Sequence, residues 1–480
     1  MAHCIGGHRI SPEATQFDPV FNPATGEIIA EVPINDFAAV NHAVRVAHEA
    51  QCAWADVPIF QRARVMMAWR DRLERYQQDL ARLITQEHGK TLADALGEIK
   101  RGIEVVELAM SAPSLLQGEI LKDVSRGIDT ESVYEPLGVT AGITPFNFPG
   151  MIPLWMAPLA IVTGNAFILK PSERTPMTSI RLWELAHDAG VPDGIFNVVH
   201  GGKPVVDALL SHPDVRAISF VGSQPVAAYV YQTAAASGKR VQALGGAKNF
   251  HIVMPDAILS KTVEALMGSA FGAAGERCLA ASVVIAVGEI ADRLVSALQA
   301  AVQQWRVGNG WEDGVDQGPL IREQHRERVR HYIEQGIKEG AKLVKDGREG
   351  TWPTTGYFLG PTIFDQVQMN MTIAQEEIFG PVLSIMRAPD LETAVAMANQ
   401  SRYGNTATIY TQSGAAARYF QRKIQAGMVG VNIGVAAPVG VFPFAGWKQS
   451  FYGDLHATGT DGLRFYTERR VTISRWWVDD

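Results

Sequence analysis

Cysteine is scarce in this chain, which has only three cysteines, Cys4, Cys52 and Cys278, among 480 residues. So few thiols exclude a disulfide-stapled fold and indicate a reducing compartment. Apolar runs of membrane-spanning length are missing, and the first residues lack the charged-then-apolar layout of a signal peptide. Basic residues are scattered and the net charge is −7, so nothing favours nucleic acid as a partner. These absences predict a cytoplasmic protein that uses neither a membrane nor nucleic acid.

Two further patterns are missing or weak. The chain has no Gly-x-Gly-x-x-Gly segment, the usual fingerprint of a dinucleotide-binding fold. His3, Cys4 and His8 lie close together near the N-terminus, but we interpret them as part of a mobile terminus and predict no metal site.

The order of apolar segments predicts an α/β fold. The first hundred residues look mainly helical, with Asp36 as an N-cap and a charged amphipathic helix over 61–87. From residue 133 onward, short apolar strands alternate with helices, which is typical of parallel sheets covered by helices. We expect two such units, with strands at 167–169, 195–199 and 217–221 in the first, and at 251–254, 283–287, 382–387, 406–410 and 428–432 in the second. The β-branched and aromatic residues 471–477 predict an edge strand that pairs with another segment or subunit.

Cys278 is the strongest candidate for a reactive residue. It follows a loop that contains Gly272 and Gly275, and Arg277 precedes it directly. Glycines let the backbone approach a ligand closely, and a neighbouring cation favours the thiolate, the form of cysteine that attacks carbonyls. Taken alone, such a cysteine is more often a buried thiol that packs as a small apolar group, and the other motifs of the chain reverse this preference.

Two segments at predicted strand ends carry polar groups suited to a site. Asn147 lies between Pro145 and Pro149, so its amide has a rigid backbone from which to donate to an oxyanion. Lys170 and Glu173 follow the strand at 167–169, where nucleotides bind in open α/β folds. A carboxylate there accepts hydrogen bonds from a ribose diol and repels a 2′-phosphate, which favours NAD over NADP.

Two later segments add weaker signals. Gly222 and Ser223 stand between a strand and a helix, a geometry that presents backbone N–H groups to a pyrophosphate. Glu377 and Phe379 precede the strand at 382–387, and an acid followed by an aromatic side chain suits a ribose and a nicotinamide ring.

Together these motifs resemble the aldehyde dehydrogenases over nearly the full length of the chain. The resemblance implies Cys278 as the nucleophile, with Asn147 and the Cys278 backbone N–H as the oxyanion hole. It implies NAD as the cofactor, and assigns to its site the residues Thr144, Phe146, Lys170, Glu173, Gly222, Ser223, Glu377 and Phe379.

One family feature is missing. Hydrolytic members carry a glutamate some thirty-odd residues before the cysteine, which activates the water that cleaves the thioacyl enzyme. Here the position is Ala243 when the glycines are aligned, or Leu244 when the lysine is aligned, and neither side chain accepts a proton. A thiol such as that of coenzyme A needs far less activation than water. The absence of the glutamate therefore favours coenzyme A as the acyl acceptor.

A narrower resemblance points the same way. Residues 144–156, 246–249 and 271–278, with 446–448 and 455–459, are similar to the coenzyme-A-acylating branch, the methylmalonate-semialdehyde dehydrogenases. The branch implies two arginines that hold the substrate carboxylate, here Arg101 and Arg277. It usually has asparagine where this chain has Leu244.

We therefore expect an NAD-dependent, coenzyme-A-acylating oxidation of methylmalonate or malonate semialdehyde to propionyl-CoA or acetyl-CoA with loss of CO₂. The alternatives are a hydrolytic semialdehyde dehydrogenase, such as one for succinate semialdehyde, and a catalytically retired binding protein. The family implies an NAD-binding domain over 1–117 and 137–246, a catalytic domain over 247–446, and oligomerisation strands over 118–136 and 464–480. These strands would assemble a homotetramer as a dimer of dimers.

Overall fold

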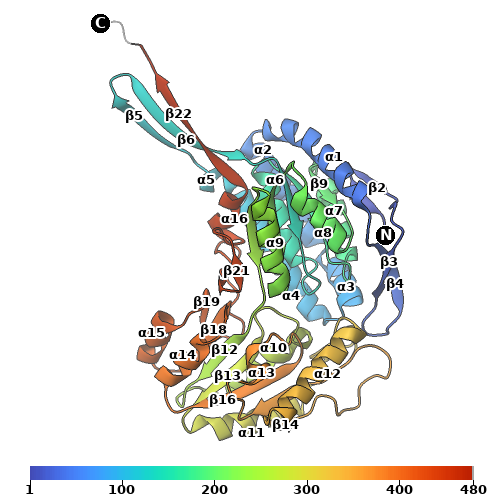
Figure 1. The fold of residues 1–480 in the computed structure, drawn as a ribbon, viewed down its shortest axis with the longest axis vertical. Helices are drawn as coiled ribbons and strands as arrows, with labels where there is room; N and C mark the ends of the chain where they lie inside the picture. The colour runs from blue at the N-terminus through green and yellow to red at the C-terminus, as the bar shows by residue number, and fades with distance from the viewer. Residues whose placement is uncertain (478–480) are drawn as a thin grey trace.

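A computed structural model describes residues 1–477, and the last three residues of the predicted 464–480 segment lie outside this range. Two large sheets, each flanked by helices, form the body, and a small sheet of long strands projects from it (Figure 1). The prediction of an α/β fold with two sheet-centred units is confirmed.

The first sheet has eight strands, and its central five are parallel. In spatial order the strands are β2 (His8–Ile10), β1 (His3–Ile5), β9 (Phe196–Val198), β8 (Ala166–Lys170), β7 (Val139–Ile143), β10 (Val215–Val221), β11 (Arg240–Leu244) and β21 (Phe451–Tyr452). The carboxyl ends of β7, β8 and β10 therefore meet at one sheet edge, where Asn147, Lys170 and Gly222 follow them.

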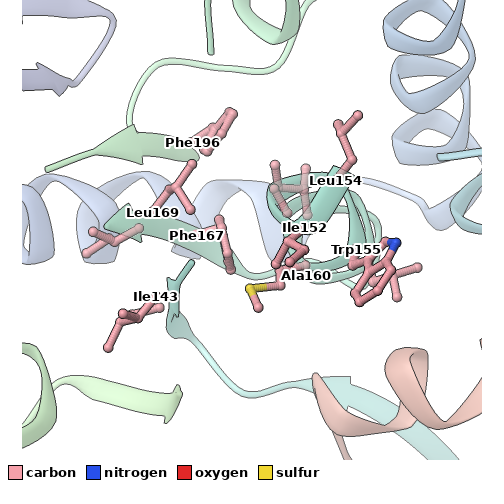
Figure 2. Close-up of a cluster of buried hydrophobic side chains, with 14 of the residues drawn as sticks. Ile143, Ile152, Leu154, Trp155, Ala160, Phe167, Leu169 and Phe196 are labelled. Atoms are coloured by element: carbon pink, nitrogen blue, oxygen red, sulfur yellow. The ribbon is translucent and has the colours of Figure 1, made fainter. Parts of the chain in front are cut away.

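Helices cover this sheet: α1 (Phe37–Ala55), α2 (Ile59–Arg75), α3 (Gln77–His88), α4 (Leu92–Met110), α6 (Met151–Val162), α7 (Met177–Asp188), α8 (Lys203–Ser211) and α9 (Gln224–Ala236). Helix α6 is apolar on all sides because it lies between the sheet and α4. Figure 2 shows this core, in which Ile152 of α6 lies near Phe167 of β8.

The second sheet has seven strands, all parallel to their neighbours except β14. Its order is β14 (Lys342–Lys345), β15 (Thr362–Asp365), β16 (Val382–Ala388), β13 (Ala281–Val287), β12 (Asn249–Val253), β18 (Thr406–Tyr410) and β19 (Met428–Val431). The helices of this unit are α10 (Leu259–Phe271), α11 (Ile290–Val302), α12 (Glu323–Lys338), α13 (Thr372–Gln375), α14 (Leu391–Asn399) and α15 (Gly414–Lys423).

The projecting sheet joins distant parts of the chain. Strand β22 (Thr467–Arg475) pairs antiparallel with β6 (Ile128–Pro136), which pairs with β5 (Glu119–Ser125). The C-terminal apolar segment thus pairs with another segment of its own chain, and Figure 1 shows the three strands extending away from the body. The short helices α5 (Ala112–Leu115) and α16 (Gly459–Phe465) lead into β5 and β22.

Two sequence expectations were wrong. The N-terminus is not a mobile segment, because His3, Cys4 and Ile5 are buried in β1, where Cys4 pairs with Val198 of β9. The first hundred residues are mainly helical, as predicted, and also contain the hairpin of β3 (Phe17–Phe21) and β4 (Ile28–Pro33). The helix predicted over 61–87 is two helices, since the backbone leaves the helical region at Tyr76.

A further short pairing joins β17 (Tyr403–Gly404) to β20 (Trp447–Lys448). Among residues 1–477 no helix is both long and apolar enough to cross a membrane.

Candidate active site

Two cavities meet at Cys278. The larger, of 790 Å³, is lined by residues that follow the strands of the first sheet, and the smaller, of 360 Å³, lies beside α4 and α6. Cys278 lines both of them, and its side chain is half-buried. A thiol in this position can react with a group that enters from one cavity while a second molecule occupies the other.

The loop before the cysteine has an unusual backbone. Ala273 and Ala274 both adopt the left-handed region, with φ of 48° and 53°. Such strain in non-glycine residues is typical of functional sites. Gly275 has φ of 71°, and a Cβ there would lie 2.3 Å from the carbonyl oxygen of Gly380. Only glycine therefore fits between the cysteine loop and the segment after Phe379.

The thiol is not activated by its arginine neighbour. Burial, with a further contribution from the charge of Glu377, raises the pKa of Cys278 to about 12. Arg277 acts in the opposite direction but more weakly, because its guanidinium faces Asp94. The adjacent cation therefore favours the thiolate, as expected, but burial outweighs its effect.

Asn147 lies beside the cysteine loop. Its side chain is buried, and its Nδ2 donates to the backbone carbonyl of Glu276 over 2.9 Å. This bond uses one of the two amide hydrogens and ties Asn147 to the residue two places before Cys278. The second hydrogen is geometrically free to serve a ligand oxygen.

A buried ion pair holds the Asn147 loop and escaped the sequence analysis. Lys90 Nζ donates to Glu98 Oε2 over 2.7 Å and to the backbone carbonyl of Asn147 over 2.5 Å. Glu98 Oε1 accepts from the backbone N–H groups of Gly150 and Met151. The two charged side chains thus clamp the loop at both ends of the segment from 147 to 151.

The larger cavity gathers the predicted cofactor residues. Lys170 Nζ lies 3.4 Å from Glu173 Oε2. Burial alone would raise the pKa of Glu173, but the Lys170 charge and a backbone hydrogen bond bring it below its ordinary value, so Glu173 is ionised. Across the cavity, α9 begins after Ser223. The larger cavity is also lined by Thr144, Phe146, Gly222, Glu377 and Phe379.

Glu377 and Phe379 close the cavity near the thiol. Burial raises the pKa of Glu377 to about 7, and its Oε1 accepts from the Ala247 N–H over 3.0 Å. Phe379 adopts φ of 60°, and its ring packs edge-on against that of Phe146, with centroids 5.8 Å apart. All the residues predicted for the cofactor are therefore brought together, from segments far apart in the sequence.

The smaller cavity contains both predicted arginines. Arg277 Nη2 lies 2.6 Å from Asp94 Oδ1, and Arg101 Nη1 lies 3.0 Å from Glu104 Oε2. The two acids were not predicted, although the sequence carries a signal for them. Asp94, Glu98, Arg101 and Glu104 follow one another at intervals of four, three and three residues, which places them along one face of a helix.

Apolar residues occupy the position at which hydrolytic family members carry the glutamate base, and their surroundings are apolar too. Ala243 and Leu244 are both buried in β11, where they belong to the core of the first unit. Gly245, the next residue, lines the larger cavity.

Comparison with known proteins places this geometry in a family. Residues 10–472 match the model of the aldehyde dehydrogenase family. The chain is 55% identical over 473 residues to malonate-semialdehyde dehydrogenase 2 of Geobacillus kaustophilus, covering 98% of each chain. It is 53% identical to the malonate-semialdehyde dehydrogenase of Halalkalibacterium halodurans, covering 98% of this chain and 97% of that protein.

Solved structures agree. The crystal structure of methylmalonate-semialdehyde dehydrogenase from Oceanimonas doudoroffii superposes with a TM-score of 0.98 at 49% identity, covering 100% of this chain and 99% of that one. A protein of Sinorhizobium meliloti 1021 described as a methylmalonate-semialdehyde dehydrogenase, solved in complex with NAD, also gives 0.98, at 47% identity and with 99% and 98% of the chains covered. The chain therefore belongs to the aldehyde dehydrogenase family.

Proposed function

We propose that this enzyme oxidises malonate or methylmalonate semialdehyde with NAD and transfers the acyl group to coenzyme A. One observation carries the proposal: Cys278 lies where a cavity containing two arginines meets a cavity lined by Lys170 and Glu173. The first suits an aldehyde that bears a carboxylate, because guanidinium groups bind carboxylates with two parallel hydrogen bonds. The relatives named for these two semialdehydes support this substrate class.

The larger cavity fits NAD. Helix α9 has 13 residues, and the Ser223 side chain makes no capping hydrogen bond among the described residues, so first-turn N–H groups can receive a pyrophosphate. The ionised Glu173 and Lys170 suit the adenine-side ribose. Glu377 and Phe379 suit the nicotinamide-side ribose and ring. The proposed NAD-binding set is Thr144, Phe146, Lys170, Glu173, Gly222, Ser223, Glu377 and Phe379.

The chain's own groups would act in sequence at the thiol. Arg101 and Arg277 would seat the carboxylate, and the Cys278 thiolate would attack the aldehyde carbon. The oxyanion that forms would accept from Asn147 Nδ2 and the Cys278 N–H. When bound, NAD supplies the hydride acceptor that leaves a thioester on Cys278.

The remaining steps, loss of CO₂ and transfer of the acyl group to coenzyme A, need no proton from outside the reactants. The β-carboxylate leaves as CO₂, and the α-carbon takes the proton released from the attacking thiol. Coenzyme A, as its thiol, exchanges with the enzyme sulfur to give acetyl-CoA or propionyl-CoA and regenerate Cys278. Overall, the semialdehyde, NAD⁺ and the coenzyme A thiol become acyl-CoA, CO₂ and NADH. The apolar positions Ala243 and Leu244 support a thiol acceptor, since no side chain there activates water.

Turnover of malonate semialdehyde with and without coenzyme A tests the proposal. We expect steady NADH formation and acetyl-CoA only when coenzyme A is present. Free acid formed at the same steady rate without coenzyme A would contradict it.

A hydrolytic semialdehyde dehydrogenase is the second candidate, and one observation favours it. Glu377 shares a cavity with Cys278, and its pKa of about 7 suits a general base. In that case Glu377→Gln would slow the release of free acid far more than it slows the first turnover of NADH. A retired binding protein would instead bind NAD and form no NADH at all.

We also propose that the projecting sheet assembles the homotetramer. In the single chain, its strands and the two residues after β22 expose apolar side chains to water, which assembly would cover: Ile120, Leu121, Val124, Val471, Ile473, Trp476 and Trp477. In this scheme 1–117 and 137–246 form the NAD-binding domain, 247–446 the catalytic domain, and 118–136 and 464–480 the oligomerisation strands. The molecular mass of Ile473→Glu in solution, compared with the unsubstituted chain, tests the assembly.

A further inference from the structure

The two arginines of the smaller cavity are already paired with acids of their own chain. Arg277 Nη2 lies 2.6 Å from Asp94 Oδ1, and Arg101 Nη1 lies 3.0 Å from Glu104 Oε2. Both acids line the same 360 Å³ cavity as the thiol. If a substrate carboxylate binds these guanidinium groups, it meets donors that another carboxylate occupies.

The two acids are not held equally. Glu104 Oε2 also accepts from the backbone N–H of Gly440 over 3.2 Å, and Arg101 Nη2 donates to the carbonyl of Ala437 over 3.1 Å. Arg101 and Glu104 are thus both anchored to the 437–440 segment. This arrangement keeps the Arg101 guanidinium in one place whether or not a ligand is present.

Asp94 has no comparable anchor. Among the hydrogen bonds of the described residues, its carboxylate accepts only from Arg277, and its side chain is 24% exposed. Asp94 lies in the first turn of α4, where the helix N-terminus favours a negative charge. Solvent and the helix can therefore stabilise this carboxylate after it leaves Arg277.

Arg277 would stay behind when Asp94 leaves. Its Nη1 donates to the backbone carbonyl of Gly268 over 3.2 Å, and a Cβ at Gly272 would lie 2.8 Å from Nη1. The guanidinium is therefore packed against the turn that leads to the cysteine loop. Its Nη2 is the group that a new carboxylate would take over.

On the basis of the proposed function, we propose that Asp94 is a specificity-determining residue, an internal carboxylate that occupies Arg277 until the substrate carboxylate displaces it. In the free enzyme Asp94 neutralises a cation close to the thiol. A carboxylated semialdehyde replaces this interaction, whereas a neutral aldehyde leaves the pair intact. The competition weakens binding of the acidic substrate and has no effect on a neutral one.

Steady-state kinetics of Asp94→Asn with two aldehydes test this inference. Asparagine keeps the shape and removes the charge. We expect the KM for malonate semialdehyde to fall about two- to five-fold, the size expected for loss of a partly exposed ion pair, with kcat nearly unchanged. The KM for propanal should stay as it is. Asp94→Ser should give the same pattern and serves if the asparagine variant folds poorly.

Glu107→Gln is the matched control. Glu107 lies on the same helix and pairs with Arg70 at the surface, outside the cavity, so its replacement changes the net charge equally. It should leave both KM values unchanged.

Other outcomes overturn the inference. A higher KM for malonate semialdehyde in Asp94→Asn would mean that Asp94 orients Arg277, and an unchanged KM would mean that it does not compete. Equal changes for the two aldehydes would also reject the competition. A different result would contradict the proposed function, namely an unsubstituted enzyme that does not prefer malonate semialdehyde over propanal.

Discussion

Replacing Lys90 by Met should damage both the stability of the enzyme and its first chemical step. Lys90 and Glu98 are 1% and 0% exposed, and together they hold the loop that carries Asn147. The methionine variant would leave the Glu98 carboxylate buried without a cation. Breaking a buried pair in this way costs about 3–5 kcal/mol.

Two details place the expected cost within this range. Glu98 would keep the N–H groups of Gly150 and Met151, which offset part of the loss. The Asn147 carbonyl would lose its donor, and an unsatisfied buried acceptor costs about 1–3 kcal/mol. We therefore expect the apparent free energy of unfolding to fall by about 4 kcal/mol. In kinetics kcat should fall more than KM rises, because the oxyanion donor would be displaced.

Urea unfolding at one protein concentration, followed by circular dichroism, measures the stability change. Lys261→Met is the control, since the Lys261–Glu264 pair is 76% and 72% exposed, and it should change the free energy by less than about 0.5 kcal/mol. The double variant Lys90→Met with Glu98→Gln should recover part of the loss, because a neutral amide can still accept the two N–H groups. A Lys90→Met enzyme as stable and as active as the unsubstituted one would refute this reasoning.

Four other predictions concern the site. Asn147→Ala should lower kcat about 10²- to 10³-fold with a small change in KM, measured as NADH formation; an unaffected kcat would exclude Asn147 from the oxyanion hole. Alkylation of Cys278 in the NAD-free enzyme should accelerate about tenfold per pH unit from pH 7 to 10 without a plateau, because its pKa is about 12 and only the thiolate reacts. A plateau below pH 9 would contradict this high pKa of Cys278. Glu377→Gln should speed the alkylation mainly above pH 7, where Glu377 is ionised and its charge disfavours the thiolate. Arg101→Met should raise the KM for malonate semialdehyde about tenfold or more and leave that for propanal unchanged, as expected for loss of a charged hydrogen-bond donor.

The parts of the site that the sequence predicted are those encoded locally. Asn147 between two prolines, and Lys170 and Glu173 after a strand, depend on a few neighbouring residues and on the rule that parallel strands end at one edge. The structure brings them together in one cavity with Cys278.

What the sequence could not predict depends on distant partners. The Arg277 guanidinium faces Asp94, 183 residues earlier in the chain, and burial of the thiol outweighs its charge, so the effect of Arg277 on the thiol was overestimated. The N-terminal strand β1 is buried because it pairs with β9, and the residues His3–Ile5 do not predict this pairing. The break at Tyr76 has no proline or glycine to mark it.

The absence of a glutamate base was predicted, but the position that it would occupy was not. Sequence alignment left two positions open, Ala243 and Leu244, which differ by one residue in β11. Both prove to be buried in the core, and the cavity wall begins at Gly245. The conclusion that no acid stands there did not depend on the register, which is why it could be drawn before the fold was known.

Mass spectrometry of the enzyme after one turnover tests the central claim most directly. With malonate semialdehyde and NAD but no coenzyme A, we expect one NADH per enzyme chain and an acetyl group on the peptide that contains Cys278. This group should disappear when coenzyme A is added. NADH formed in the same amount with an unmodified Cys278, or by Cys278→Ala, would contradict the account.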